Sequence, residues 1–244
     1  MRGVGLATAM RTLTRFRIFG PDAKDECTSL YWFPAVGGLF GVFSYLVSLL
    51  PLPVSPKAVL VVIVGAWASR GFHYDGLSDT ADGFGGGWNK ERRLAIMKDS
   101  HVGSFGMLSL ILSLLFLVSC YANLLSNVWV LFAIPMFGRN AEVMLAVPLP
   151  YAREAGTAGN LVRTAKTRHL VVSLLFCILF AFFSRRREIL FALCASLATT
   201  AILGVCSKRL IGGVTGDVLG CSEVLAECAT ALTALLYEGI GGFV

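Results

Sequence analysis

The sequence predicts an all-α integral membrane protein, a polytopic bundle of about seven transmembrane helices, with six to eight as the range. The chain has 244 residues, of which 56% are hydrophobic and only 15% charged, whereas soluble domains carry about 25% charged residues. Its apolar runs are continuous and approach the roughly 20 residues of a membrane span. They lack the alternation of barrel strands. Since lipid admits only helices and closed barrels, the runs are predicted to be helices.

Seven apolar runs are candidate spans, and nothing between them resembles a domain linker. The runs are 30–50, 58–72, 105–121, 128–149, 169–183, 189–206 and, more weakly, 224–244. Prolines punctuate the connection after the first run and end the fourth run. We therefore expect residues 1–244 to form a single integral membrane domain.

Residues 1–29 are expected to be a cytoplasmic amphipathic segment. Leu6, Met10 and Leu13 share one helical face. Arg11 and Arg15 share another. This pattern is typical of a short helix that lies on the membrane interface.

The basic residues indicate the orientation. With the N-terminus inside, the cytoplasmic segments 1–29, 70–104, 150–168 and 207–220 hold sixteen Lys and Arg, against four in the outer segments. The basic triplet 185–187 falls in a segment that this orientation places outside the cell, against the positive-inside rule. The fifth and sixth apolar runs are therefore expected to be re-entrant or shorter than 169–183 and 189–206. Because the bases lie in short loops and not on a soluble domain, we expect lipid or substrate phosphates and no nucleic acid as partners.

The segment 73–87 carries the strongest chemical signal. Asp75, Asp79 and Asp82 are spaced four and three apart and would share one helical face. No Lys or Arg lies between Gly71 and Asn89 to relieve their repulsion, so a divalent cation is the economical partner. Oxygen ligands favour Mg²⁺, Mn²⁺ or Ca²⁺ over zinc, and Mg²⁺ combines one or two carboxylates with water and substrate phosphate. The alternative is a solvated loop whose charges only set topology.

The next segment suits a phosphate-bearing substrate. Residues 89–100 are expected to form a helix capped by Asn89. Its basic side chains are Lys90, Arg92, Arg93 and Lys98. Asp99 ends this segment and completes the predicted metal set Asp75, Asp79, Asp82 and Asp99, for one ion or for two.

Ionisable residues also occur in two apolar segments. Arg139 and Glu142 lie within a predicted span, where such groups are costly and usually functional. A mutual salt bridge would be the structural alternative. Near the C-terminus, Asp217 precedes Glu223 and Glu227, which are again four apart. Either a functional site or a loop that leads into a helix with a solvent-exposed face fits this pattern.

These residues resemble one known family. The strings His73-x-Asp75-Gly-Leu-x-Asp79-Thr-Ala-Asp82-Gly83 and Arg93-Leu-x-Ile-Met-Lys-Asp99-x-x-Val-Gly103-x-Phe-Gly106 resemble the cobalamin synthases, the adenosylcobinamide-GDP ribazoletransferases. Phe33-Pro34-x-Val-Gly37, Arg139 and the segment from Gly213 to Glu223 agree too. The resemblance covers roughly residues 8–238. Loop 151–168 matches only loosely, and the proline expected soon after Arg15 is missing.

The resemblance implies a magnesium-dependent enzyme of the bacterial inner membrane, with its active site on the cytoplasmic side. It would join adenosylcobinamide-GDP to α-ribazole, or to its 5′-phosphate, and release GMP. Asp79, Asp82 and Asp99 would be catalytic, with Asp82 or Asp99 as the general base. The expected substrate-binding residues are His73, Lys90, Arg92, Arg93, Lys98, Arg139, Asp217 and Glu223. Homo-oligomers and association with other cobalamin-pathway enzymes are both left open.

Two other functions are alternatives to this transfer. A CDP-alcohol phosphotransferase would carry Ala-Arg three residues after its first Asp-Gly, whereas Gly83 is followed here by Phe-Gly-Gly-Gly. A cation transporter would place its acids near the bilayer midplane, whereas most acids of this chain cluster in one segment beside basic residues.

Overall fold

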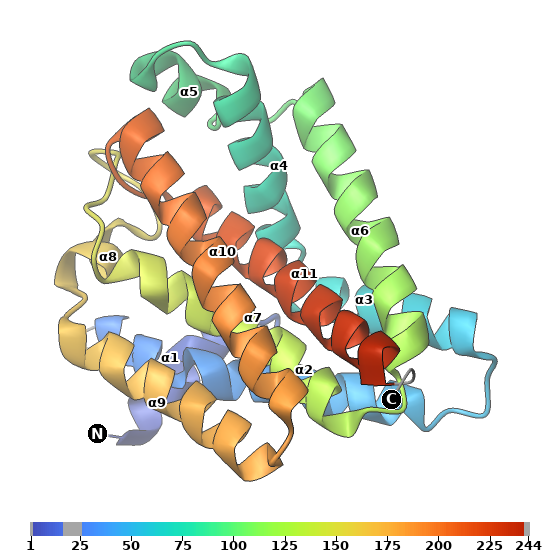
Figure 1. The fold of residues 1–244 in the computed structure, drawn as a ribbon. Helices are drawn as coiled ribbons and strands as arrows, with labels where there is room; N and C mark the ends of the chain where they lie inside the picture. The colour runs from blue at the N-terminus through green and yellow to red at the C-terminus, as the bar shows by residue number, and fades with distance from the viewer. Residues whose placement is uncertain (1, 17–25, 242–244) are drawn as a thin grey trace.

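The protein is a helical bundle, as the sequence predicts. The computed structural model describes residues 2–16 and 26–241, and this part contains eleven α-helices and one 3-10 helix (Figure 1). The helices are α1 (Arg2–Leu13), η1 (Glu26–Trp32), α2 (Phe33–Ser48), α3 (Val54–Ala68), α4 (Phe72–Gly86), α5 (Lys90–Ile96), α6 (Ser104–Leu124), α7 (Val128–Ala146), α8 (Gly159–Thr164), α9 (Thr167–Ser184), α10 (Arg187–Ile211) and α11 (Gly216–Gly241).

Six helical segments are long and apolar enough to cross a membrane. They are η1 with α2, then α6, α7, α9, α10 and α11. The shorter apolar helix α3 corresponds to the second predicted run. Each of the seven predicted runs is therefore a helix. The chain is a multi-pass membrane protein.

The spans differ in how deeply they are buried. The apolar windows of α7 and α11 are 78% and 67% buried within the protein, whereas that of α6 is only 22% buried. Exposed leucines and phenylalanines on α6, α9 and α10 give these helices surfaces suited to lipid. The polar residues of α7 and α11 consequently lie in the centre of the bundle.

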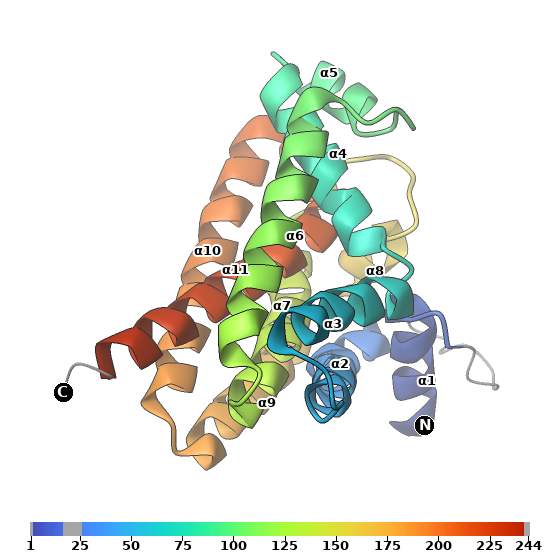
Figure 2. The same cartoon turned by 90° about the vertical axis from the view of Figure 1, so that its right-hand side faces the viewer.

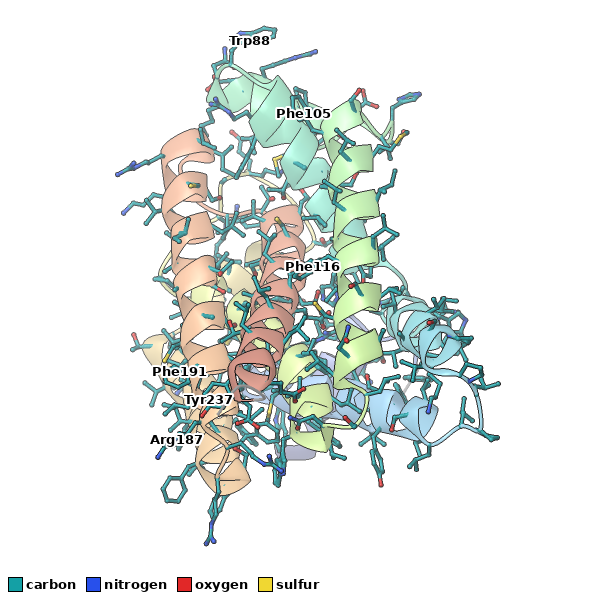
Figure 3. All side chains as sticks on the ribbon, turned by 45° about the vertical axis from the view of Figure 1, so that its right-hand side comes forward. Trp88, Phe105, Phe116, Arg187, Phe191 and Tyr237 are labelled. Carbon is teal, nitrogen blue, oxygen red and sulfur yellow. The ribbon has the colours of Figure 1, made fainter. Side chains whose placement is uncertain are left out.

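The expectation that the fifth and sixth runs are shorter than 169–183 and 189–206 is wrong, and their re-entrance stays a prediction. Helices α9 and α10 contain 18 and 25 residues. Arg185 takes the left-handed conformation (φ 52°) between them. The α9–α10 turn lies at the end of the molecule opposite α5 (Figure 2), and Arg187 and Trp88 mark the two ends in Figure 3.

Helix α1 packs on protein through the face that was expected to meet lipid. Met10 and Leu13 are buried in a cluster with residues of η1 and α2. The Arg70 guanidinium donates to the carbonyls of Arg11 (3.0 Å) and Thr12 (3.1 Å), which ties the end of α1 to the end of α3. Helix α1 is therefore held against η1, α2 and the end of α3. Residues 17–25 of the predicted N-terminal segment lie outside the described residues.

Glycines allow two close helix crossings. A Cβ at Gly37 would lie 2.6 Å from the Cα of Met136, so α2 and α7 meet backbone to backbone. In the same way, a Cβ at Gly76 would lie 2.6 Å from the carbonyl oxygen of Asp217. The second crossing brings the start of α4 against the start of α11, and it places the candidate site.

Candidate active site

The site begins at the turn from α3 into α4. Arg70 and Gly71 are both left-handed, with φ of 60° and 72°, and they reverse the chain so that α4 starts inside the bundle. Asp75 lies exposed in the first turn of α4, and Asp79 follows one turn later, half-buried. A left-handed arginine is unusual and often marks a functional turn.

The α4–α11 crossing adds a third carboxylate. Asp217, in the first turn of α11, lies against Gly76 and therefore beside the acidic face of α4. Burial, followed by the negative charges of Asp75 and Asp217, raises the pKa of Asp79 from 3.8 to about 7. Like charges accumulate here with little compensation.

One cation does reach this acidic group. Arg153 Nη2 lies 2.8 Å from Asp217 Oδ2. The loop before α8 is held against the start of α11, because Ala152 N–H donates to the Val214 carbonyl (2.8 Å) and Val214 N–H donates to the Pro150 carbonyl (2.9 Å). Sequence reasoning missed Arg153, since its loop matches the family pattern only loosely.

A cavity of about 710 Å³ opens beside these residues. Its polar wall includes Arg70, Asp75, Glu142, Thr157 and Asp217. Helix α1 contributes Thr8 and Thr12 to the same wall. The volume falls within the range of small-molecule sites, which is about 300–1,000 Å³. One cation, Arg70, and several acids line one concave surface, as a polyphosphate substrate bound with a metal would require.

The other two predicted metal ligands lie elsewhere. Asp82 is 8% exposed and accepts hydrogen bonds from the backbone N–H groups of Gly103 (2.7 Å) and Gly106 (2.8 Å) at the start of α6. Asp99 is exposed beyond α5 and accepts from His101, whose ring nitrogen lies 2.6 Å away and lowers the Asp99 pKa. Both line a second, smaller cavity of about 320 Å³.

The predicted set of four carboxylates is therefore divided in this structure. Within the described part of the chain, no three His, Cys, Asp or Glu side chains are close enough to hold an ion by themselves. Asp75 lines the large cavity together with Asp217, a predicted substrate-binding residue, whereas Asp79 is half-buried one turn further along α4. The metal set Asp75, Asp79, Asp82 and Asp99 stays a prediction.

The predicted phosphate-binding helix is α5, with the expected cap. Asn89 Oδ1 accepts from Arg92 N–H (2.8 Å), and the helix ends at Ile96. Lys90, Arg92 and Lys98 are exposed. Arg93 is half-buried and donates to the Leu210 carbonyl (3.3 Å). Arg92 also lines the second cavity.

The intramembrane charges form a buried network, and the Arg139–Glu142 salt bridge, the structural alternative, is not formed. Arg139 pairs with Glu223 and, at 2.6 Å, with Glu227. Its guanidinium also lies 4.2 Å from the centre of the Phe40 ring. Glu142 instead contacts His73, in the first turn of the acidic helix α4. Arg139 and Glu142 are three residues apart on α7, but each pairs with a side chain of a neighbouring helix.

The family assignment follows from comparison with known proteins. The sequence model described as cobalamin-5-phosphate synthase matches residues 5–235. The chain belongs to this family. It is 44% identical to an adenosylcobinamide-GDP ribazoletransferase of Chlorobium phaeovibrioides, over 94% of this chain and 96% of that one. The corresponding protein of Chlorobium chlorochromatii is 45% identical, over 95% and 96%, and that of Chlorobaculum tepidum 40% identical, over 97% of each.

Membership makes this cobalamin-5-phosphate synthase family protein a transferase of cobalamin synthesis. The predicted resemblance is confirmed. The relatives named above point neither to a CDP-alcohol phosphotransferase nor to a cation transporter. No solved structure matches the chain.

Proposed function

We propose that this enzyme joins adenosylcobinamide-GDP to α-ribazole, or to α-ribazole 5′-phosphate, with release of GMP and formation of adenosylcobalamin or its 5′-phosphate. The observation that carries the proposal is the large cavity, whose wall combines Asp75 and Asp217 with Arg70. Relatives covering nearly the whole chain are named for this transfer. The bacterial inner membrane, with the cavity on the cytoplasmic side, is the proposed location.

The donor set beside the cavity fits magnesium. Asp75, Asp79 and Asp217 offer only oxygen ligands, the type that Mg²⁺ prefers. The raised pKa of Asp79 reflects its burial first and then the negative charges of Asp75 and Asp217. When bound, Mg²⁺ would neutralise the diphosphate and stabilise the charge that develops on the departing GMP. We therefore propose that these carboxylates hold the ion together with oxygens of the substrate phosphates, because they do not lie close enough to hold it by themselves.

The basic side chains near the cavity have different proposed roles. Arg70 lies in the cavity wall, where a guanidinium can donate two parallel hydrogen bonds to a phosphate. Arg153, at 2.8 Å from Asp217, fixes that carboxylate in place. The exposed bases of α5, Lys90, Arg92 and Lys98, remain predicted contacts for parts of the donor that extend beyond the cavity.

The deciding experiment measures GMP. Purified protein in nanodiscs receives adenosylcobinamide-GDP with and without α-ribazole, at increasing Mg²⁺, and the nucleotide products are separated by chromatography. We expect GMP release that requires both acceptor and Mg²⁺ and that is matched by an equal amount of cobalamin product. Asp75→Asn should raise the Mg²⁺ requirement. Glu154→Gln, an exposed carboxylate of the loop before α8, should not.

Two results would contradict the proposal. Release of GMP without acceptor would show a hydrolase. Failure to release GMP at saturating donor, acceptor and Mg²⁺, by protein that is folded, would remove the assigned transfer altogether.

A further inference from the structure

We propose that Glu142 is the proton acceptor for the attacking hydroxyl and that His73 positions it. This inference rests on the proposed function. It differs from the sequence-based expectation, in which Asp82 or Asp99 was the general base. The sequence alone identifies Glu142 only as an ionisable residue within a predicted span.

Glu142 lies at the boundary between the cavity and the bundle interior. It belongs to α7, the most buried span, and is 4% exposed. Nevertheless it lines the 710 Å³ cavity, on the same wall as Asp75 and Asp217. A carboxylate in this place faces the substrate while it is shielded from bulk water, and a general base must be within reach of the hydroxyl it deprotonates.

His73 supports Glu142 from behind. Its Nε2–H donates to Glu142 Oε1 (3.1 Å), and the ring is 1% exposed. On the other side of the ring, Nδ1 lies 3.8 Å from Glu223 Oε1. His73 lines the narrow inner cavity, together with Arg139 and Glu223. The imidazole therefore fixes the orientation of the Glu142 carboxylate.

The two earlier candidates are less suited to the task. Both Asp82 oxygens accept backbone N–H groups of Gly103 and Gly106, and this carboxylate lines the other cavity. Both oxygens of Asp82 are therefore already occupied by backbone donors. Asp99 is exposed, and its pKa is lowered by the hydrogen bond from His101.

The step balances without a further reactant. The ribose hydroxyl oxygen of α-ribazole attacks the phosphorus that carries cobinamide, and its proton passes to Glu142. The bond from that phosphorus to the bridging oxygen of the diphosphate breaks, and its electron pair leaves on GMP. The proton on Glu142 is later returned to water or to the departing phosphate.

The test separates base catalysis from binding. Glu142→Gln keeps an oxygen that can accept the His73 hydrogen bond, but it cannot take up a proton. We expect kcat to fall by about 100-fold or more, the scale of general base catalysis, while KM for donor and acceptor, the Mg²⁺ requirement and the unfolding temperature stay at wild-type values. Glu154→Gln is the matched control and should keep wild-type kcat.

Each other outcome has a defined meaning. A folded Glu142→Gln enzyme that retains wild-type kcat, or that loses activity only through a raised KM, would overturn the assignment. If the Gln variant does not fold, Glu142→Asp decides: it keeps the charge but withdraws it from the cavity by one methylene, and unchanged kcat would overturn the assignment. Absence of GMP release from wild-type protein would instead count against the proposed function itself.

Discussion

At the scale of the residue, Asp79 shows how neighbours change the chemistry of a side chain. Burial and the charges of Asp75 and Asp217 raise its pKa to about 7. The folded protein therefore holds a proton on Asp79 at pH values where an unfolded chain has lost it. Without a cation, the free energy of unfolding should fall as pH rises from about 4 to about 7, because the unfolded state binds fewer protons in that range.

A pH-dependent magnesium requirement follows. Mg²⁺ must displace the Asp79 proton, so its half-saturating concentration should decrease as pH rises from about 6 to about 8 and level off above the pKa. Magnesium titrations of turnover at several pH values would measure this. Asp79→Asn should need more Mg²⁺ and lose the pH dependence of the requirement. An unchanged titration in that variant would show that Asp79 does not contact the metal.

At the scale of the element, Asp82 joins two helices. Its carboxylate accepts the free N–H groups of Gly103 and Gly106 at the start of α6, although it belongs to α4. A Cβ at Gly103 would lie 2.5 Å from Asp82 Oδ1, so the glycine is required for this approach. The family-like Val-Gly-x-Phe-Gly string thus has a structural role, which is to dock α6 onto the acidic helix.

Loss of this contact should be measurable as stability. Asp82→Asn offers one acceptor in place of two, and removal of such a cap costs about 1 kcal/mol. We expect a lower unfolding temperature in nanodiscs, detected by a fluorescence or calorimetric scan. The control is Asp99→Asn, which changes the exposed Asp99–His101 pair. This variant should unfold at the wild-type temperature. Equal unfolding temperatures for Asp82→Asn and wild type would show that the cap contributes nothing to stability.

Turnover of Asp82→Asn, measured well below its unfolding temperature, would separately test the catalytic role predicted for Asp82.

At the scale of the whole molecule, the two ends differ in charge and partners. The segments 2–16, 70–104, 150–168 and 207–220 carry most of the basic residues of the described chain, whereas the α9–α10 turn carries the basic triplet 185–187. Trp88 and Arg187 lie at opposite ends (Figure 3). If the positive-inside rule holds, Trp88 is cytoplasmic and Arg187 is outside.

This topology can be tested by labelling. Trp88→Cys and Arg187→Cys variants in a background without native cysteines would be treated with a membrane-impermeant maleimide. In cells with a permeable outer membrane, Arg187→Cys should react. Trp88→Cys should react only after the inner membrane is opened. The reverse pattern would invert the protein and move the active site to the other side.

Composition and pattern alone were enough for the membrane class, the seven apolar helices, the family and the acidic helix, because each of these depends on residues close together in the chain. Local spacing also placed Asp75 and Asp79 on one face and made Asn89 a cap. Only the tertiary structure decided the partners: Asp217 joins Asp75 and Asp79 through the Gly76 crossing, Asp82 turns to α6, and Arg139 and Glu142 pair with separate helices. Spacing along one helix says which side chains share a face, but helix packing determines which charges from other helices meet that face, and in a buried site those contacts outweigh the local ones.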